Sequence, residues 1–476
     1  MKISSSQAHR NVVALGQTDF LPAIGLALAA AIVMIPGLGL QSLASWDEAV
    51  HGVAARELLA RPRLTLHYGG NPWFDKPPLL FWLMAATSSV FGLTEFALRL
   101  PSAISGIGAV VLTYFIGRRL GGRAAGLLAA ICLLGVPQFV AYSRLAMTDI
   151  PLVALGMLSI FLVMYGKNQP AMTIAAGAAF GLALLTKSIA AFLFLPGLIA
   201  IIVALRGLRA LWSRDIVAAA FAALVVALPW YLWLAMTHGR PFIEEHLIFH
   251  VLNRLRPLQG HEGDRLFYFY LYWVNAGWLA LFHSTGIVVA TCLALRNRDR
   301  LLGAIVIFAL GTFLIVNAQA TKIGWYLTPV YAGAAVAAAV AITRILPNDS
   351  ARVAAILLLI LLAIPGILHG RAGFVEGYNI LDYSPEIRSL RNVPPFINTR
   401  VPALYVAKVA DPAPRFYLAD QVKSIDQDEL ERLVAANQPF LCLTFKWFAD
   451  EFLNRHPQAG LAIVASAESL AVIERR

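Results

Sequence analysis

The chain has 476 residues, of which 59% are hydrophobic and only 14% are charged, with a formal net charge of +11. This composition excludes an ordinary soluble globular protein and indicates a membrane protein with several spans. The positive charge does not point to a nucleic-acid-binding protein, because the arginines gather in short loops between apolar segments.

Apolar segments long enough to cross a bilayer recur along the chain, as in a polytopic α-helical membrane protein. We count about eleven such spans, at 21–41, 98–117, 124–141, 150–166, 171–186, 189–205, 216–236, 269–294, 301–317, 326–343 and 353–368. Lys2 and Arg10 precede the first span, and no convincing cleavage site follows it. We therefore expect a retained first helix rather than a cleaved signal peptide.

Three short loops carry arginine clusters, at 118–123, 206–214 and 296–300. When the spans alternate in direction, all three loops fall on the side of the N-terminus, which the positive-inside rule makes cytoplasmic. The long polar segment 42–97 and the tail after the last span are then expected on the opposite side of the membrane.

The first polar segment begins with Trp46-Asp47-Glu48 at the outer end of the first span, and we expect a helix over 47–60. A carboxylate deep in hydrocarbon costs about 2.5–3.5 kcal/mol on insertion scales, so charges at span ends are a functional hypothesis. The alternative is a solvated pair at a helix start. We favour a role for Asp47 and Glu48 in a polar cavity at the membrane surface.

Asp75-Lys76-Pro77-Pro78 follows in the same segment and leads into an apolar helix expected over 77–91, which is too short to span and should lie along the interface. One interpretation is a turn in which Lys76 extends its ammonium group to the membrane surface. The other is a lysine held at headgroup depth to bind a phosphate.

Further charged residues stand at the outward ends of later spans. Asp149 is either a cap of its helix or a carboxylate that faces Asp47, with Arg144 near an anionic ligand. Two more lysines occupy such junctions, Lys187 and Lys322, the latter followed by Tyr326. Each could be an anchor, but together with Lys76 they could surround the phosphate of a lipid headgroup.

A second polar region, 237–266, contains His246 and His250 at an i, i+4 spacing that suits a metal. The pair is not part of an H-E-x-x-H motif, and a structural role in this aromatic segment is the stronger alternative. Neither a P-loop nor a dinucleotide-binding glycine motif is present, so we expect no nucleotide cofactor.

The segment 370–476 is expected to form a small soluble α/β domain. We predict strands at 403–409, 421–425, 440–445 and 461–464, and helices at 428–436 and 446–455. The three cysteines, Cys132, Cys292 and Cys442, have no spacing typical of a metal site or a disulfide framework.

The ordered set of motifs resembles the polytopic lipid-sugar glycosyltransferases of the GT-C type. The resemblance is strongest to the branch with the aminoarabinose–lipid A transferase and the protein O-mannosyltransferases. It covers about 41–331 and rests on Trp46-Asp47-Glu48 with Arg56-Glu57, Asp75-Lys76-Pro77-Pro78-Leu79, Arg99-Leu100-Pro101-Ser102, Arg144 to Asp149, Glu245-His246, and Lys322 with Tyr326 and Pro329.

The resemblance implies an inverting transferase in the bacterial inner membrane, with a polyprenyl-phosphate-sugar donor. The acceptor would be lipid A, another cell-envelope glycan or protein, at the outer leaflet. A catalytic membrane domain, 1–369, would carry the periplasmic loop 42–97, and 370–476 would be a periplasmic domain.

By position, the resemblance makes Asp47 the base or acceptor-orienting carboxylate, supported by Glu48, and Asp149 a second carboxylate of the cavity. It makes Lys76 a ligand of the donor phosphate. It also implies a candidate divalent-cation site at Asp75 and His246.

Two positions depart from the family pattern. Val50-His51 replaces a common aromatic residue, and Thr186-Lys187-Ser188-Ile189 replaces the common Thr-Lys-Gly-Pro. The competing hypotheses are a transporter or flippase of lipid-linked sugars and a non-catalytic partner built on a decayed enzyme. Clustering of the charges at one surface, without internal repeats, favours the transferase.

Overall fold

The computed structural model describes residues 16–44, 46–252, 263–373, 384–392, 404–419 and 421–475, and it leaves the side chains of 250–252 and 384 undescribed. These residues form two compact units. The first takes in the described residues of Met1–Pro36, Phe74–Leu80 and Arg99–Tyr378, and the second those of Gly37–Trp73, Phe81–Leu98 and Asn379–Arg476.

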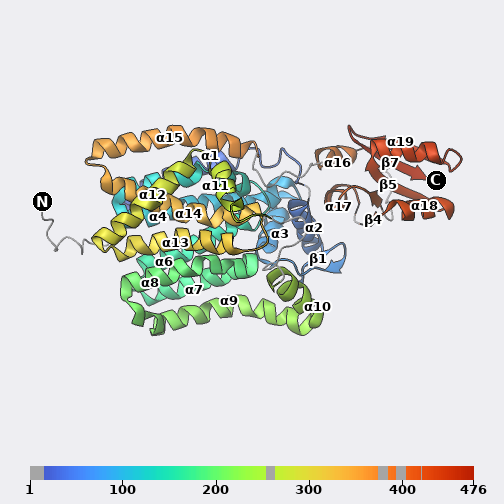
Figure 1. The fold of residues 1–476 in the computed structure, drawn as a ribbon. Coiled ribbons are helices and arrows are strands. Elements are labelled where there is room, and N and C mark those ends of the chain that lie inside the picture. Colours follow the sequence, from blue (N-terminus) through green and yellow to red (C-terminus); the bar gives the residue numbers. More distant parts are fainter. Residues whose placement is uncertain are drawn as a thin grey trace. The chain divides into compact units, whose positions relative to one another are not determined.

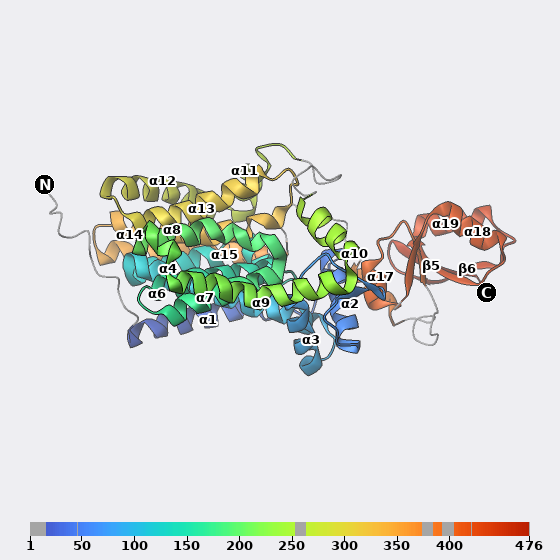
Figure 2. The same ribbon diagram turned by 90° about the horizontal axis from the view of Figure 1, so that it is seen from below.

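The first unit is a bundle of helices that run side by side (Figures 1 and 2). Its helices are α1 (Phe20–Met34), α4 (Glu95–Leu134, in this unit from Arg99), α5 (Pro137–Ser143), α6 (Asp149–Tyr165), α7 (Pro170–Lys187), α8 (Leu195–Arg206), α9 (Arg214–His238), α10 (Arg240–Phe242), α11 (Phe267–Ala276), α12 (Leu279–Asn297), α13 (Arg300–Ala318), α14 (Thr328–Ile345) and α15 (Asp349–Arg371). Short helical segments join them, η2 (Gln17–Asp19), η3 (Ser188–Phe194), η4 (Leu208–Trp212), the π-helical η5 (Ile243–Leu252) and η7 (Gly324–Leu327).

Eight helical stretches in the described part of the chain are long and apolar enough to cross a membrane. Two of these stretches correspond to more than one predicted span. Glu95–Leu134 consists of two helices joined at Gly122, which has φ 81°, and it covers the predicted span 98–117 and part of 124–141. Pro170–Arg206 consists of α7 and α8 joined by η3, and it covers the predicted spans 171–186 and 189–205. The shorter apolar helix α6 matches a further predicted span. The polytopic helical fold class is confirmed, whereas the count of about eleven stays a prediction.

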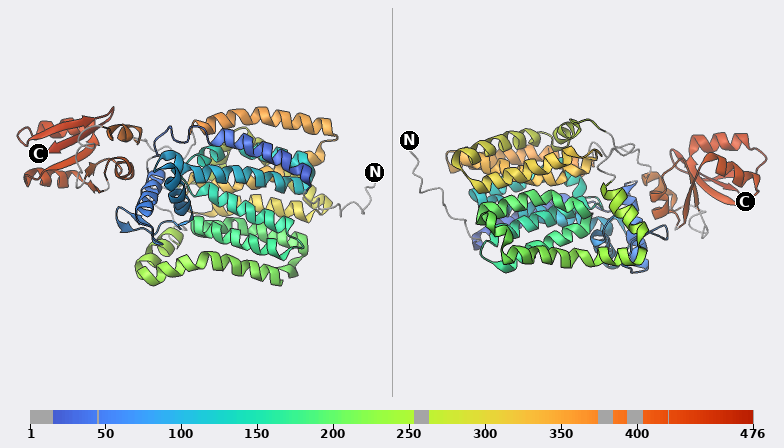
Figure 3. Two further views of the ribbon diagram at one scale, coloured as in Figure 1. Left: turned by 180° about the vertical axis from the view of Figure 1, so that it is seen from behind. Right: turned by 60° about the horizontal axis from the view of Figure 1, so that its bottom comes forward.

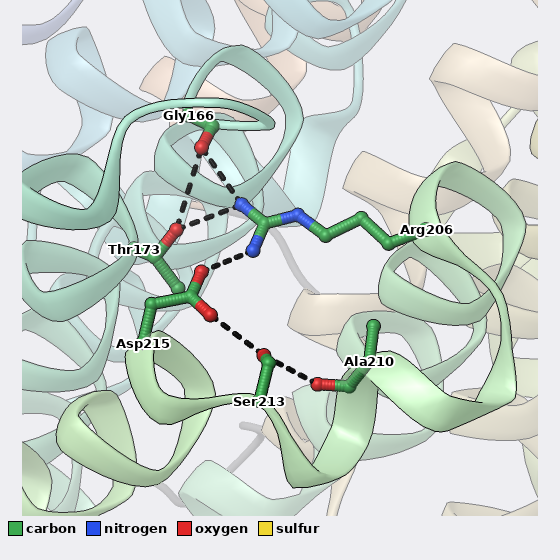
Figure 4. Close-up of polar contacts among 6 residues, drawn as sticks. All are labelled: Gly166, Thr173, Arg206, Ala210, Ser213 and Asp215. Atoms are coloured by element: carbon green, nitrogen blue, oxygen red, sulfur yellow. Dashed lines mark hydrogen bonds and ion pairs between the residues drawn. The ribbon is translucent and has the colours of Figure 1, made fainter.

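The arginine-rich loops stabilise one end of this bundle (Figure 4). Arg206, at the end of α8, donates to the carbonyl of Gly166 at 2.7 Å and to the hydroxyl of Thr173 at 2.9 Å, and it forms an ion pair with Asp215. The hydroxyl of Ser213 donates to the same carboxylate at 2.6 Å. These contacts join the ends of α6, α7, α8 and α9, so this cluster has a structural role.

The second unit combines the first polar segment with the C-terminal region. Its polar segment forms α2 (Asp47–Ala60), the short strands β1 (His67–Tyr68) and β2 (Asn71–Pro72), and α3 (Leu79–Phe91, in this unit from Phe81). The predicted helix 47–60 has the observed bounds, and the predicted helix 77–91 begins two residues later than expected. Both helices are therefore confirmed as elements.

The C-terminal region forms a five-stranded sheet in the order β4-β3-β5-β7-β6, seen in both views of Figure 3. Its elements are α16 (Ser384–Leu390), β3 (Leu404–Ala407), α17 (Pro412–Tyr417), β4 (Val422–Ile425), α18 (Gln427–Ala435), β5 (Phe440–Phe445), α19 (Lys446–Arg455), β6 (Leu461–Ser466) and β7 (Leu470–Arg475). The strand β3 pairs in parallel with β4 and β5, and β7 pairs antiparallel with β5 and β6.

The core of this sheet lies beneath α18 and α19, which cover the same face (Figure 2). Cys442 and Ile473, opposite each other in register, are buried there together with Phe448 and Phe452 of α19. The predicted α/β character is confirmed, but β7 was not predicted. Its apolar run at the chain end becomes a strand because β5 and β6 supply its backbone partners.

Candidate functional site

A cavity of about 610 Å³ opens in the first unit, at the end of α7 that lies away from the Arg206 cluster. Its lining residues are Asp75, Lys76, Pro77, Lys187, Ser188, Ile189, Ala190, Phe192, Leu193, His246, Ile315, Ala318, Gln319 and Tyr326. The lining includes both charged and apolar side chains. Five of the residues predicted for the site meet here although they lie in four different parts of the chain, namely Asp75, Lys76, Lys187, His246 and Tyr326.

Lys187 forms a buried ion pair beside this cavity. Its Nζ lies 2.5 Å from Oδ1 of Asp149, and the two side chains are 10% and 2% exposed. The same ammonium group lies 5.4 Å from the centre of the Tyr326 ring, a cation–π contact. Because the carboxylate of Asp149 balances the charge of Lys187, this lysine contributes less net positive charge to the cavity than an unpaired lysine would.

Lys76 differs from the other lysines of the predicted site. It lines the cavity, is partly exposed, and makes no hydrogen bond or ion pair within the described parts of the chain. A lysine ammonium carries three donors and a full charge. Lys76 therefore has donors available for an anionic group in the cavity.

His246 fixes the backbone just before this lysine. Its Nδ1 lies 2.5 Å from the carbonyl oxygen of Phe74, which can only accept, so Nδ1 carries a proton. Nε2 faces the hydroxyl of Ser188 at 3.3 Å. The ring is buried and stacks on Phe242. A histidine that donates one ring N–H to a carbonyl is oriented as metal-binding histidines are.

Asp75, the residue after Phe74, lines the same cavity as His246. Within the described residues no group of three or more histidine, cysteine or acidic side chains could hold a metal ion. Asp75 and His246 therefore supply at most two protein ligands, and other ligands would have to come from water or substrate. The side chain of His250, the other histidine of the predicted pair, lies outside the described residues.

Ser188 was not predicted as a site residue. It has φ 49° and ψ −133°, a backbone conformation that is almost restricted to glycine. It stands where the family pattern has glycine, so the backbone shape is kept while a hydroxyl is added. The available signal in the sequence was this departure from the family pattern, but it did not indicate the contact with His246.

Lys322 and Arg144 make protein contacts of their own. The Nζ of Lys322 donates to the carbonyl of Asn317 at 2.8 Å and lies 5.1 Å from the Tyr268 ring centre. Burial lowers the pKa of this ammonium group. Lys322 is not among the residues that line the cavity.

The guanidinium group of Arg144 donates to carbonyls at the end of α1, at 2.8 Å to Met34 and 2.9 Å to Pro36. Burial, together with the charges of Arg371 and Arg99, lowers the pKa of Arg144 to about 10. These contacts stabilise the junction of α1 and α5, and a phosphate-binding role for Arg144 stays a prediction.

Asp47 and Glu48 begin α2 in the second unit, so a meeting of Asp47 with Asp149 stays a prediction. Glu48 is fully buried, and its Oε2 accepts from the backbone N–H of Ala44 at 2.7 Å. Trp46, just before the helix, has φ 78° and ψ −120°, which is a strained conformation for a bulky residue. Such strain is typical of functional turns that the surrounding structure holds in place.

Comparison with known proteins relates this geometry to a family. The family model described as dolichyl-phosphate-mannose-protein mannosyltransferase matches residues 75–233. An undecaprenyl phosphate-α-4-amino-4-deoxy-L-arabinose arabinosyl transferase of Pseudomonas fluorescens is 30% identical over 271 residues, which cover 54% of this chain and 47% of the relative. The chain spans between 47% and 62% of the length of three curated relatives that it matches.

Solved structures show the same fold. The crystal structure of ArnT from Cupriavidus metallidurans bound to undecaprenyl phosphate has a TM-score of 0.72 at 19% identity, with 96% of this chain and 98% of that chain covered. The oligosaccharyltransferase of Archaeoglobus fulgidus, in complex with Zn and sulfate, has a TM-score of 0.55 at 15% identity, with 91% and 69% covered. These comparisons confirm the predicted resemblance to the GT-C type, in the branch of the aminoarabinose and mannosyl transferases.

Proposed function

We propose that this protein is an inverting glycosyltransferase that moves a sugar from a polyprenyl-phosphate carrier to an acceptor at the outer leaflet. The acceptor class is lipid A, another cell-envelope glycan or protein. The observation that carries the proposal is the cavity of about 610 Å³, whose lining combines Lys76 with apolar side chains such as Ile189, Phe192 and Leu193. A lipid phosphate has this combination of a charged head and an apolar chain.

In this proposal, Lys76 binds the donor phosphate and the apolar side chains of η3 contact the isoprenoid chain. Lys187, held by Asp149, adds a second cationic group at the rim, and Tyr326 positions it. Arg144 and Lys322 bind the phosphate only if they exchange their present carbonyl contacts for it. Lys76 is therefore the principal phosphate ligand.

The reaction is a single displacement at the anomeric carbon. The acceptor oxygen forms the new bond, the bond between the anomeric carbon and the phosphate oxygen breaks, and polyprenyl phosphate departs with the electron pair. Asp47 orients a hydroxyl acceptor and takes its proton, whereas an ionised phosphate acceptor needs no base. Lys76 and Lys187 stabilise the negative charge of the leaving phosphate.

Asp75 and His246 are the residues that would hold a divalent cation in this cavity. Such an ion would add positive charge at the leaving group. The chain's own contribution is the orientation of the His246 ring by the carbonyl of Phe74.

We further propose that the protein lies in a bacterial inner membrane as a multi-pass protein, with the cavity facing the periplasm. The arginine-rich connections α8–α9 and α12–α13 lie at the end of the bundle where α1 begins, which supports a cytoplasmic placement of that end (Figure 1). The proposed domains are a catalytic membrane domain, 1–369, with loop 42–97, and a periplasmic domain, 370–476.

The test compares polar membrane lipids, by mass spectrometry, from cells with the wild-type protein and with Asp47→Asn. We expect a polyprenyl-phosphate sugar to accumulate in the variant, with loss of the same sugar mass from an envelope acceptor. The control is Asp428→Asn, which removes an exposed carboxylate from α18. Normal transfer by a folded Asp47→Asn protein would overturn the assignment of Asp47. Loss of donor translocation in the variant, together with no transfer by the purified wild-type protein, would favour the flippase.

A further inference from the structure

The C-terminal region contacts the turn that leads into α2. The hydroxyl of Tyr417, the last residue of α17, accepts a hydrogen bond from the backbone N–H of Leu43 at 2.7 Å, across 374 positions of sequence. The same hydroxyl donates to Oε1 of Glu95 at 3.1 Å. Burial raises the pKa of Tyr417 well above its usual range, so the hydroxyl keeps the proton that it donates.

The surrounding surface is closely packed. Arg56 of α2 donates to the carbonyls of Arg415 and Phe416 at 3.0 and 3.2 Å. A Cβ atom on Gly52 would lie 2.6 Å from a Leu43 methyl carbon and 3.1 Å from the Phe416 ring, so a larger residue there would require these side chains to shift. The face of α2 around Gly52 and Arg56 is therefore in close contact with α17.

The turn between Leu43 and Asp47 contains the strained residue. Trp46 has φ 78°, and its side chain is 54% exposed, so packing of the indole ring does not account for the backbone conformation. The backbone before Trp46 is instead held by two side chains. Tyr417 fixes the N–H of Leu43, and Glu48 fixes the N–H of Ala44. A strained turn persists only where its surroundings determine it.

We propose that Tyr417 is a positioning residue for the transfer reaction, through which the C-terminal domain maintains the strained turn at Trp46 and thereby the orientation of Asp47. This inference rests on the proposed function, because it assigns Tyr417 an effect on Asp47. It gives the C-terminal α/β domain a part in catalysis that needs no contact with substrate.

The test is Tyr417→Phe in the full-length protein, which keeps the ring and removes only the hydroxyl. The control is Tyr405→Phe in β3, whose hydroxyl has no hydrogen-bond partner within the described residues. Two measurements are made on each, amide hydrogen exchange of the peptide that contains 43–48, and kcat and KM for the polyprenyl-phosphate-sugar donor.

We expect Tyr417→Phe to speed exchange at 43–48 and to lower kcat at least about tenfold, with the donor KM within about twofold of wild type. The KM should be kept because the cavity residues belong to the first unit. Tyr405→Phe should change neither the exchange rate at 43–48 nor the kinetic constants. Unchanged exchange, or an unchanged kcat despite faster exchange, would overturn the inference.

Arg56→Met is the second variant, for the case that Tyr417→Phe fails to fold, because it removes the hydrogen bonds from α2 to the carbonyls of Arg415 and Phe416 in α17. Like Tyr417→Phe, this variant should speed amide exchange at 43–48 and lower kcat. Exchange at 43–48 as slow as in the wild-type protein would contradict the inference. Absence of transfer by the wild-type protein would refute the proposed function instead, and the exchange data would still decide whether Tyr417 holds the turn.

Discussion

Lys187 and Asp149 form an ion pair that is buried at the edge of the cavity, with Nζ 2.5 Å from Oδ1. The two residues come from the end of α7 and the start of α6, so the pair joins adjacent helices of the bundle. A buried pair contributes little net stability relative to apolar residues, but loss of one partner leaves an uncompensated buried charge.

We therefore predict that Asp149→Asn and Lys187→Met each lower the stability of the detergent-solubilised protein by about 3–5 kcal/mol, measured as a fall in the thermal midpoint. The double variant should recover most of this loss, because no lone charge remains. It should not recover transfer, since the cavity has lost its second cation. Recovery of transfer in the double variant would contradict a catalytic role for the pair.

Lys76 gives a contrasting prediction, because its ammonium group makes no bond within the described residues. Lys76→Gln should leave the thermal midpoint nearly unchanged and raise the donor KM by about 10- to 100-fold, which corresponds to a charged hydrogen bond of about 1.5–3 kcal/mol. Lys167→Gln, which removes an exposed lysine between α6 and α7, is the matched control. A large stability change in Lys76→Gln would indicate a structural role instead.

Metal dependence follows from the arrangement of Asp75 and His246. If the pair binds a divalent cation, purified protein should contain a metal that elemental analysis detects, and Asp75→Asn and His246→Gln should each lose it. Chelation should then slow transfer by the wild type, and readdition of the metal should restore it. Full transfer in the presence of a chelator, by protein with no detectable metal, would exclude this site.

Cys442 provides a pH-dependent prediction for the second unit. Burial in the sheet core raises the pKa of this thiol from 9.0 to about 12. The unfolded chain therefore loses the thiol proton at a lower pH than the folded one. The contribution of this group to stability is complete below pH 9 and is lost as the pH rises toward 12, at up to about 1.4 kcal/mol per pH unit.

Cys442→Ala should remove that part of the pH dependence, which a comparison of unfolding free energies between pH 8 and pH 11 would reveal. The native thiol should also resist alkylation at pH 8. An identical slope in wild type and variant, or rapid alkylation of the folded protein, would show that the thiol is accessible to water.

Local pattern was sufficient for much of the architecture. The bounds of α2, β5 and α19 agree with those predicted, because helix and strand periodicity and the residues at their ends are properties of short segments. The membrane class followed from composition for the same reason. The break at Gly122 falls within the arginine-rich loop 118–123 that was predicted between two spans.

The contacts of the site residues could not be predicted from local sequence pattern. Four cations were predicted together as phosphate ligands because each lies at the end of a span, namely Lys76, Lys187, Lys322 and Arg144. Tertiary contacts separate them: Lys187 is paired with Asp149, and Lys322 and Arg144 donate to carbonyls. Only the tertiary structure decided that Lys76 is the cation whose N–H donors are available to a ligand. The partners of the other three cations come from distant positions in the chain and are brought beside them by helix packing.

The same distinction applies to the turn before Asp47. The sequence by itself determined that two carboxylates begin a helix at the end of the first span. It could not indicate that Tyr417, near the other end of the chain, bonds to Leu43. The reason is physical: a segment's periodicity specifies its own backbone hydrogen bonds, whereas strain and charge are balanced by whichever side chains the completed fold places beside them.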